Sequence, residues 1–431
     1  MLKFRWETEF KETEIGEIPK EWRVVSISGS PFAIIMGQSP PSRYYNKEGR
    51  GMLFIQGRKD FGDIYILPTS YTERCNKIAP AGSVLITVRA PVGDINITKN
   101  EVCIGRGLAA IYHTNKNLIL NRFIYYALIG LKDYIASFGE RGTTYEEIIK
   151  EDLEKLKISY PPPTEQSRIA TVLSWFDDLI ENKKKQNEIL EKTAMAIFKS
   201  WFIDFEPFKD GEFVYNSELG REIPKEWEVK AIGDKKIATL IKGISYNSPD
   251  ISPKAQGNLF ITLNNFLRGG GFKTEYTYYI GTKAKENHKI KDGHLIIALT
   301  DMTSEARVVG APAIVVLPYG YDFGIISLDC AKIQLNSNWL KFFIYLYLKY
   351  SQEENSTFAN GVNVLHLNIK LFMQNKLILI PPQPILQKFH SLVEPLFQKI
   401  ILNQKQIMVL RKVRDILLPK LVFGKLRVVQ I

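Results

Sequence analysis

The sequence predicts an α+β protein with two similar globular domains and two long helices that pair as an antiparallel coiled coil. Three observations support this fold class: an internal repeat of about half the chain, short β-rich runs in each copy, and a change to helical periodicity after a double proline in each copy. With 431 residues, 45% of them hydrophobic, the chain is long enough for each domain to bury its own core.

The internal repeat consists of matching segments in the same order. The pentapeptide Ile-Pro-Lys-Glu-Trp occupies 18–22 and recurs at 223–227. Further along, Ile-Ser-Tyr-Pro-Pro at 158–162 matches Ile-Leu-Ile-Pro-Pro at 378–382. We therefore expect two copies of one structural plan, with loop insertions in the second copy.

Each copy is predicted to begin with a globular domain and to end with a helix. The globular parts combine short β-rich runs, such as 84–88 and 295–299, with one helix-like stretch in each copy. The predicted parts are a first globular domain at 1–160, a central helix at 161–210, a second globular domain at 211–380 and a distal helix at 381–431.

After each double proline, apolar residues recur at alternate steps of four and three, the spacing of a helix that buries one stripe. Helices of roughly 35–40 residues are about 50–60 Å long, and a domain of this size is too small to cover such a stripe. We therefore expect the helices to pair; the alternative is that each packs on its own globular domain. Lys183, Asn187 and Asn403 fall in the predicted seam, where they fix the register or face solvated gaps.

Composition narrows the class of protein. No uncharged apolar run is long enough to span a bilayer, and 12% aromatic residues argue against intrinsic disorder. Cys75, Cys103 and Cys330 are too few and too dispersed for a disulfide framework, and the chain does not begin like a secretion signal, so we expect a cytoplasmic protein. The formal net charge of +11, concentrated in 381–431, indicates an acidic partner, most commonly nucleic acid.

The sequence contains no recognisable catalytic constellation. It lacks a phosphate-binding loop and a dinucleotide-binding glycine motif, and its five histidines have no partners at metal-ligand spacing. The double prolines do not follow the acidic or amide residue expected of an amino-methyltransferase, and the Pro-Asp pair at 249–250 has no nuclease-like Asp/Glu-x-Lys after it. We therefore predict no catalytic residue, no metal and no cofactor.

Loops that mix basic, amide and aromatic residues are the candidate DNA contacts. Arg and Lys can bind guanine edges, and Asn and Gln can bind adenine edges; the alternative for each residue is an ordinary solvated loop. The predicted DNA-binding residues are Arg43, Lys47, Arg50, Gln56, Arg58, Lys59, Arg89 and Arg141 in the first copy, and Asn264, Asn265, Arg268, Lys273 and Arg307 in the second.

Together these features resemble the specificity (S) subunit of type I restriction-modification systems. The resemblance covers essentially the whole chain and rests on the repeated Ile-Pro-Lys-Glu-Trp opening, on Gly142-Thr143-Thr144, and on the run from Ile158 to Ile169 that leads into a long helix. In the second copy Gly361-Val-Asn replaces Gly-Thr-Thr. The resemblance implies two target-recognition domains, each reading one half of a bipartite, asymmetric site in double-stranded DNA.

The resemblance also implies protein partners. These are methyltransferase (M) subunits, two per chain, which bind S-adenosylmethionine, and restriction (R) subunits, which use ATP; the chain itself is then not an enzyme. We expect the M subunits to dock on the long helices, although coiled-coil core is the alternative for the aromatic residues there. The predicted partner-binding residues are Trp175, Trp201, Lys405, Arg411, Lys412 and Arg414.

Helices of about 50–60 Å correspond to roughly 15–18 base pairs, which leaves roughly 5–8 unread pairs between two half-sites. Two functions from other classes stay open at this point. The first is a stand-alone DNA methyltransferase or nuclease with degenerate motifs. The second is a coiled-coil scaffold that does not bind DNA.

Overall fold

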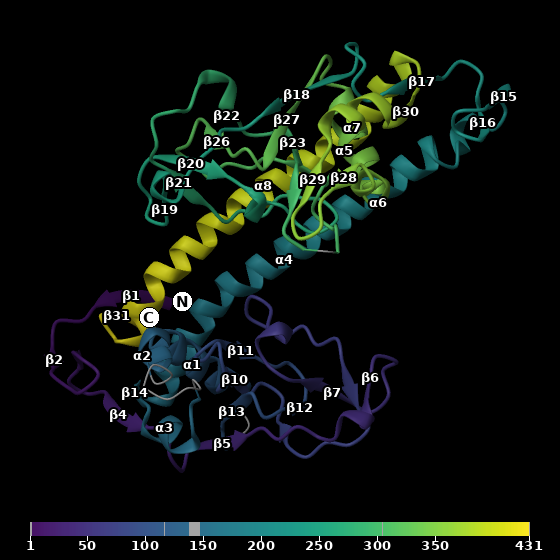
Figure 1. Ribbon diagram of the computed structural model, residues 1–431. Coiled ribbons are helices and arrows are strands. Elements are labelled where there is room, and N and C mark those ends of the chain that lie inside the picture. Colours follow the sequence, from purple (N-terminus) through teal and green to yellow (C-terminus); the bar gives the residue numbers. More distant parts are fainter. Residues whose placement is uncertain (1, 116, 138–146, 304, 431) are drawn as a thin grey trace. The chain divides into compact units, whose positions relative to one another are not determined.

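A computed structural model describes residues 2–115, 117–137, 147–303 and 305–430 of the chain. Two helices of 40 residues each, α4 (Pro163–Phe202) and α8 (Gln383–Val422), are continuous over their whole length (Figure 1). The chain divides into two compact units, and each long helix contributes one part to each of them. Unit 1 comprises Met1–Ile180 with Leu410–Ile431, and unit 2 comprises Glu181–Val409.

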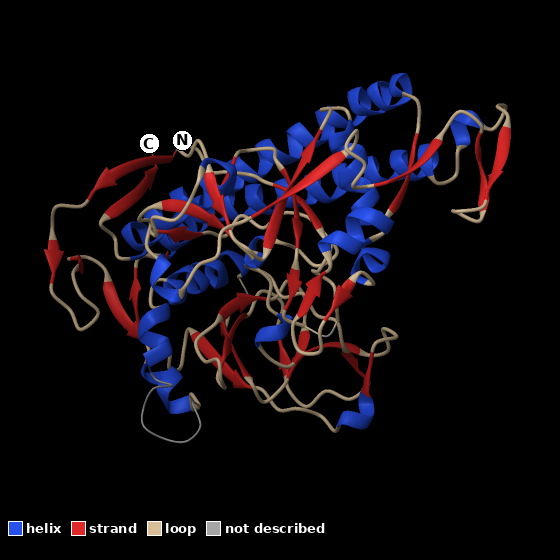
Figure 2. Cartoon of the chain, turned by 45° about the horizontal axis from the view of Figure 1, so that its top comes forward, coloured by secondary structure: helices blue, strands red, loops and turns tan. Residues whose placement is uncertain are grey.

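Unit 1 contains a four-stranded sheet in the order β11-β10-β13-β5 and a five-stranded sheet in the order β6-β8-β7-β12-β9. Short strands are joined by long loops (Figure 2). Its strands are β1 (Leu2–Trp6), β2 (Phe10–Lys11), β3 (Ile18–Pro19), β4 (Arg23–Ser26), β5 (Phe32–Met36), β6 (Tyr45–Asn46), β7 (Met52–Ile55), β8 (Tyr71–Thr72), β9 (Ile78–Ala79), β10 (Val84–Thr87), β11 (Ile95–Ile97), β12 (Val102–Ile104), β13 (Leu108–His113), β14 (Lys157–Tyr160) and β31 (Leu426–Gln430). Its shorter helices are α1 (Leu118–Ile129), α2 (Lys132–Ser137) and α3 (Lys150–Lys155).

Unit 2 repeats this plan, with sheets in the orders β25-β23-β27-β18 and β19-β21-β20-β26-β22. Its strands are β15 (Phe213–Asn216), β16 (Arg221–Pro224), β17 (Glu228–Ala231), β18 (Ala238–Lys242), β19 (Ile251–Ser252), β20 (Asn258–Ile261), β21 (Thr277–Tyr279), β22 (Lys289–Ile290), β23 (Leu295–Ala298), β24 (Thr300–Asp301), β25 (Pro312–Ile314), β26 (Gly324–Ile326), β27 (Cys330–Leu335), β28 (Ala359–Asn360), β29 (Leu365–Leu367) and β30 (Leu377–Ile380). Its shorter helices are α5 (Leu340–Tyr350), α6 (Gln352–Ser356) and α7 (Ile369–Asn375). The α+β duplication predicted from the sequence is confirmed.

Gly37 and Gly243 occupy equivalent positions in the two units, and both positions require glycine. A Cβ atom on Gly37 would lie 2.1 Å from the backbone oxygen of Gly105, and one on Gly243 would lie 2.1 Å from that of Ser327. Both contacts join the four-stranded to the five-stranded sheet immediately after β5 or β18. Because no side chain fits at such a distance, only glycine allows the two sheets to approach in either unit.

The tryptophan of each Ile-Pro-Lys-Glu-Trp motif packs against the end of a long helix. In unit 1 Trp22 is fully buried, and its indole N–H donates to Glu165 at the start of α4, 3.1 Å away. In unit 2 the ring of Trp227 packs at 5.2–5.8 Å between centroids on three phenylalanines at and after the end of α4, Phe202, Phe205 and Phe208. The repeated motif therefore attaches the first strands of each globular part to the helices.

The two long helices contact each other in each unit and run antiparallel. In unit 2 Asn403 donates to Asn187 at 2.9 Å, and Lys183 donates to Gln406 at 2.6 Å. Higher residue numbers in α4 thus pair with lower residue numbers in α8, as antiparallel helices require. In unit 1 buried Asp177 of α4 pairs with Arg414 of α8 at 2.7 Å. The apolar residues of both helices also enter the cores of the globular parts. The long helices therefore pair with each other and also pack on the globular domains. The sequence analysis gave these two arrangements as alternatives.

The sequence analysis did not anticipate the single disulfide found among the described residues. Cys75 and Cys103 form a disulfide with 5.6 Å between their Cα atoms, whereas Cys330 is free and buried. The two residues are separated by 28 positions in sequence and meet because β12 places Cys103 in the core beside the loop that follows β8. Sequence spacing alone does not show whether two cysteines lie close enough to form a disulfide.

A buried ion cluster closes unit 1. Arg427 of β31 is 5% exposed and pairs with Glu165 at 2.5 Å and also with Glu7 and Glu21. Strand β31 pairs along its length with β1, so the cluster joins both strands to the first turn of α4 (Figure 1). Burial opposes ionisation of Glu7, but the backbone N–H groups of Thr8 and Glu9 and the guanidinium of Arg427 lower its pKa overall.

We predict that Arg427→Met lowers the free energy of unfolding of unit 1 by about 3–5 kcal/mol at neutral pH, because buried carboxylates lose their counter-charge. The pKa of Glu7 is lower in the folded than in the unfolded state. In the unsubstituted chain, ionised Glu7 therefore adds to the free energy of unfolding at neutral pH, and this contribution is lost as the pH falls through the folded-state pKa. Urea unfolding at several pH values measures both effects. Arg23→Met, at an exposed arginine of β4, is the matched control, and an equal loss in both variants would contradict the prediction.

Candidate nucleic-acid interface

In unit 1 the predicted loop after β7 forms a short 3₁₀ turn, Arg58–Asp60. Arg58 and Lys59 are exposed, while Asp60 is buried and accepts a hydrogen bond from the backbone N–H of Gln56 at 2.8 Å. The guanidinium of Arg58 pairs with Asp94 at 2.7 Å, and Asp94 also pairs with Lys132 at 2.8 Å. The turn therefore presents to solvent one paired arginine and one lysine that pairs with no described carboxylate.

The equivalent turn in unit 2, Leu263–Asn265, has the same construction with different exposed residues. Asn265 is buried, accepts from the backbone N–H of Thr262 at 2.9 Å, and donates to the carbonyl groups of Lys273 and Glu275. Its predicted role as a DNA-binding residue is wrong, because its polar atoms are occupied inside the protein. Its neighbour Asn264 is exposed. Asp60 and Asn265 hold the turns, and sequence reasoning did not identify that role.

Two further loops of unit 2 lie beside this turn. The carboxylate of Glu305 lies between Arg268, at 3.4 Å, and Arg307, at 3.3 Å, so two predicted DNA-binding residues meet. Ala306, which separates Glu305 from Arg307, has a φ angle of 51°, a strained conformation for alanine. Asp301 stabilises the loop from within, because its carboxylate accepts from the backbone N–H groups of Thr303 and Val308, at 2.8 and 2.7 Å.

A groove of about 380 Å³ opens where these loops meet. Asn264, Met302 and Val364 line it, together with polar groups such as Asp329. Met302 is 77% exposed, and Val362 in the adjacent Gly361 loop is 91% exposed. Exposed apolar tips beside an amide and two arginines suit a duplex groove, where thymine methyl groups alternate with hydrogen-bonding edges.

The remaining predicted contacts lie on the surface, mostly in ion pairs. In unit 1 Arg50 pairs with Glu73 at 3.2 Å, and Arg89 binds Glu147 with two hydrogen bonds. In unit 2 Lys273 pairs with Glu275 at 2.7 Å. Gln56 is half-buried, Arg43 and Lys47 are exposed, and Arg141, with the Gly-Thr-Thr motif, lies outside the described residues. Exposed pairs of this kind contribute about 0–1 kcal/mol each, so phosphate or a base edge can replace the carboxylate.

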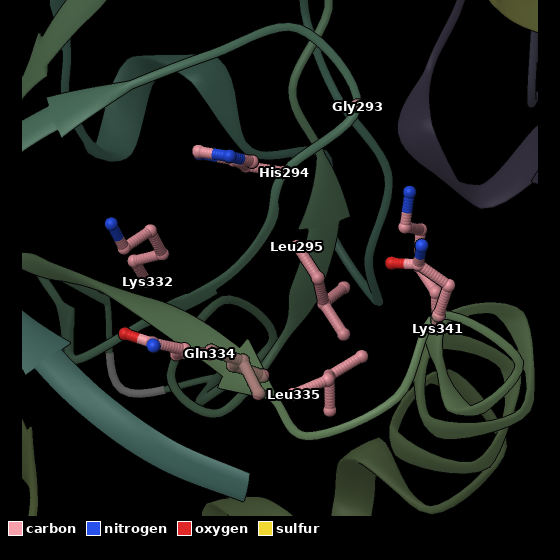
Figure 3. A pocket seen from close by; sticks show the side chains of 9 residues that line it. Gly293, His294, Leu295, Lys332, Gln334, Leu335 and Lys341 are labelled. Carbon is pink, nitrogen blue, oxygen red and sulfur yellow. The ribbon is translucent and has the colours of Figure 1, made fainter.

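Unit 2 also carries a basic hollow of about 350 Å³ (Figure 3). His294, Lys332, Gln334 and Lys341 surround it, and neither lysine pairs with a described carboxylate. Burial and the nearby lysines lower the pKa of His294 to about 4, so its imidazole is neutral at physiological pH. Sequence reasoning missed this hollow because Lys332 lies in β27 and Lys341 in α5, whereas candidate contacts were sought in loops.

Most of the predicted partner-binding residues have intramolecular partners instead. Trp201 packs among Phe202, Phe208 and Phe389, with ring centroids 5.9–6.1 Å apart. Lys405 pairs with Asp292, Arg411 with Asp63, and Arg414 with Asp177. The structure therefore favours the coiled-coil and core alternative for Trp201 and gives these three cations structural roles. Trp175, at 53% exposure, and the exposed Lys412 are left as available contacts.

Within the described ranges, no helix combines the length and the apolar character that crossing a membrane requires. The described side chains also include no group of three His, Cys, Asp or Glu residues that could hold a metal ion.

The duplicated α+β plan, the paired long helices and the differing cationic loops define a class of two-part recognition proteins. Comparison with known proteins identifies the family. The model of the type I restriction modification DNA specificity domain matches twice, at residues 19–192 and 224–412. The chain belongs to this family, and its part in such a system is DNA specificity.

Individual relatives agree with this assignment. The type I restriction enzyme MjaIX specificity subunit of Methanocaldococcus jannaschii is 41% identical, with 99% of each chain covered. The HindI specificity subunit of Haemophilus influenzae is 24% identical over 73% of this chain and 80% of its own. The crystal structure of a type I S subunit from M. genitalium, 19% identical, has the same fold, with a TM-score of 0.56 over 93% of this chain and 96% of that one.

We predict opposite effects for the neighbouring asparagines of the unit 2 turn. Asn265→Ala should lower the free energy of unfolding by about 1–3 kcal/mol, because two backbone carbonyl groups and one N–H lose their partner. Asn264→Ala should change it by no more than about 0.5 kcal/mol, because the side chain is exposed. Urea unfolding measures both values, and equal losses would show that the assignment of the buried asparagine is incorrect.

Proposed function

We propose that the chain reads a split, asymmetric double-stranded DNA site, with one half-site bound by each unit. The observation that carries this proposal is the pair of equivalent 3₁₀ turns, Arg58–Asp60 and Leu263–Asn265. The turns share a buried polar residue at their ends but expose different side chains. Matching frameworks with different exposed residues support two half-sites of different sequence.

The second part of the proposal concerns chemistry. Methylation and restriction are performed by the M and R subunits, and the chain brings them to the site that it has bound. The S-adenosylmethionine and ATP that those reactions use are accordingly bound by the partners. We infer that the assembly acts in the cytoplasm, where the chain meets cellular DNA. The alternatives of a stand-alone enzyme and of a scaffold without DNA affinity are not favoured by the family assignment.

We propose that the M subunits dock on apolar side chains that the long helices leave exposed. In unit 1 these are Trp175 and Leu179, one helical turn apart on α4, and Ile416 on α8. In unit 2 Ile189 of α4 is 64% exposed. Each unit thus has apolar helical surface of its own, as two M subunits per chain require.

A methylation map of a host genome tests the split site. We expect methylated adenines only within a motif of two defined half-sites separated by unread base pairs. Substituting Arg58 and Lys59 by Gln should weaken discrimination in one half-site by about 1–3 kcal/mol per lost base contact, while Asn264→Ala with Arg268→Gln affects the other half-site. A continuous motif, or a change in both half-sites from one pair of substitutions, would refute the assignment of one half-site to each unit.

Substitutions on the long helices test partner docking. Trp175→Ser with Leu179→Ser should leave folding and DNA affinity intact but weaken assembly with the M subunit by about tenfold or more, because a docked aromatic side chain carries a large share of interface energy. Analytical ultracentrifugation of the mixed subunits measures assembly. Gln387→Ser with Lys388→Ser, at exposed positions of α8 outside the named apolar residues, is the control. Unchanged assembly of the Trp175 variant would place the docking surface elsewhere.

A further inference from the structure

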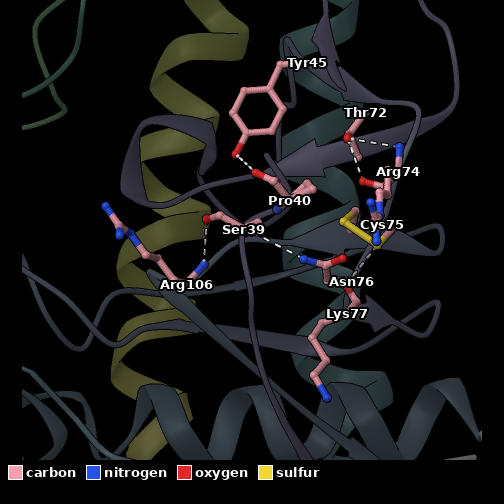
Figure 4. The surroundings of a disulfide bond; sticks show 10 residues. Ser39, Pro40, Tyr45, Thr72, Arg74, Cys75, Asn76, Lys77 and Arg106 are labelled. Atoms are coloured by element: carbon pink, nitrogen blue, oxygen red, sulfur yellow. Dashed lines mark hydrogen bonds between the residues drawn. A yellow bond between two sulfur atoms is a disulfide. The ribbon is translucent and has the colours of Figure 1, made fainter. Parts of the chain in front are cut away.

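Three arginines that pair with no described carboxylate, Arg43, Arg74 and Arg106, lie in loops of the five-stranded sheet of unit 1. Figure 4 shows Arg74 and Arg106. The guanidinium groups of Arg43 and Arg74 lie 5.1 and 5.8 Å from the ring centre of Tyr44. Arg43 donates to the phenol oxygen at 3.5 Å, and the two neighbouring guanidinium groups lower the pKa of the Tyr44 hydroxyl. Arg106 and Lys77 stand on either side of Ser39 and Asn76, which connect the neighbouring loops. We call Arg43, Tyr44 and Arg74 the Tyr44 cluster.

The pairing of charges separates this cluster from the predicted contacts Arg50, Arg58 and Arg89 of unit 1, each of which pairs with a carboxylate. Residues 43–50 and 73–77 hold five basic and two acidic side chains. Arg50 binds both acids, Glu48 at 3.7 Å and Glu73 at 3.2 Å. Among the described residues, no carboxylate pairs with Arg43, Arg74 or Arg106, so the cluster keeps a surplus positive charge that an outside anion can neutralise.

The disulfide and a set of hydrogen bonds hold the cluster in place (Figure 4). Cys75, which follows Arg74 directly, is bonded to the fully buried Cys103 of β12. The hydroxyl of Thr72 donates to the carbonyl of Arg74 at 2.7 Å. The backbone N–H of Arg106 donates to the hydroxyl of Ser39 at 3.1 Å. The backbone carrying Arg74 and Arg106 is thereby fixed in advance, which reduces the entropy lost when a ligand binds.

The second copy provides an internal comparison, because strand pairing fixes which residues correspond. Tyr45 pairs with Thr72 in unit 1 as Ile251 pairs with Tyr279 in unit 2, and Cys103 pairs with Phe54 as Ile325 pairs with Phe260. The positions of Tyr44, Arg74 and Arg106 are accordingly taken by Asp250, Gly281 and Leu328, and those of the two cysteines by Thr282 and Ile325. The cations and the disulfide thus occur together in unit 1 and are both missing at the corresponding positions of unit 2.

The cluster is connected to the turn that we propose reads bases, because Tyr45, next to Tyr44, packs on Phe54 of β7 with 4.6 Å between ring centroids. Arg106 lies closer to that turn. Arg106 lies between Gly105, whose N–H donates to the carbonyl of Ile55 at 2.8 Å, and Gly107, where a Cβ atom would lie 2.7 Å from the carbonyl oxygen of Gln56. Ile55 and Gln56 lead directly into the turn Arg58–Asp60. A duplex whose base edges face that turn brings its phosphates to the neighbouring surface, whereas an acidic protein partner has no such reason to lie there.

We propose that the Tyr44 cluster is a phosphate clamp that binds the DNA backbone beside the half-site of unit 1, and that the Cys75–Cys103 disulfide holds it in the binding geometry. This inference rests on the proposed function and adds a site for a phosphodiester to it. Guanidinium groups bind phosphate oxygens through pairs of hydrogen bonds, and the phenol contributes a further donor. Because phosphates are the same at every sequence, the clamp contributes affinity and register but no base preference.

The test is the salt dependence of DNA binding by the full chain assembled with its M subunit. Arg43→Gln with Arg74→Gln should reduce the slope of log affinity against log salt by about 1.8, and weaken binding roughly 10- to 30-fold at about 0.15 M salt, equally for cognate and non-cognate duplexes. Arg43→Lys with Arg74→Lys should keep the slope, because the charges stay. Lys11→Gln with Lys20→Gln removes two charges from exposed positions of the same unit and should change nothing.

Two outcomes overturn the clamp. An unchanged slope in the Gln variant with normal cognate binding would show that DNA does not touch these residues. Loss of M-subunit binding with DNA affinity retained would show that the cluster serves a protein instead. If the unaltered assembly showed no preference for any DNA sequence, the proposed function itself would fail, and this result differs from both of the others.

The role of the disulfide is tested by a thermodynamic cycle. Cys75→Ser should weaken DNA binding about three- to tenfold in the native background, because loop 73–77 must then be ordered on binding. In the Arg43→Gln, Arg74→Gln background the same substitution should have no further effect. Equal losses in both backgrounds would show that the disulfide acts only on overall stability. Thiol labelling in denaturant should find one reactive cysteine, Cys330, in the unreduced chain and three after reduction; three before reduction would contradict the disulfide.

Discussion

The ion cluster at Arg427 is the interaction on which the architecture of unit 1 depends. It joins strand β31, the opening motif through Trp22, and the first turn of α4 through Glu165. Three carboxylates share one guanidinium, so removal of the arginine is more costly than removal of any one acid. Unit 2 attaches its opening motif mainly by aromatic packing, because Trp227 lies in a cluster with Phe202, Phe205 and Phe208. The same opening motif is thus held by a buried ion cluster in unit 1 and by aromatic packing in unit 2.

The ion pairs on the reading loops bear on specificity. Asp94, Glu147 and Glu305 each hold an arginine that is otherwise free to bind any phosphate. Displacing such a carboxylate costs little when the incoming group bonds the arginine equally well. A poorly matched base leaves the acid facing the DNA backbone, where the like charges repel. Under the proposed function, the pairs therefore disfavour wrong sequences more than they stabilise the free protein.

The sequence was sufficient for the large-scale organisation, because repetition and periodicity survive in residue order. It predicted the duplication, both long helices and the loops that carry exposed cations. It failed where a side chain's role is decided by burial: Asn264 and Asn265 are adjacent and chemically identical, yet only the second is inside. The roles of Trp201 and Arg414 within the fold, and the meeting of Cys75 with Cys103, depend on partners distant in sequence. No local pattern encodes such partners.

The division of the chain into units also has a consequence for the order in which they form during translation. Unit 2 is one uninterrupted stretch, Glu181–Val409, whereas unit 1 draws on Leu410–Ile431 as well as on the first 180 residues. Leu418 and Leu421 belong to the unit 1 core, and Arg427 neutralises its acids. The domain that the ribosome makes first is therefore completed last, after the whole of unit 2 has been synthesised. A nascent chain that stops in the last part of α8, after Val409, carries a finished second domain and an open first one.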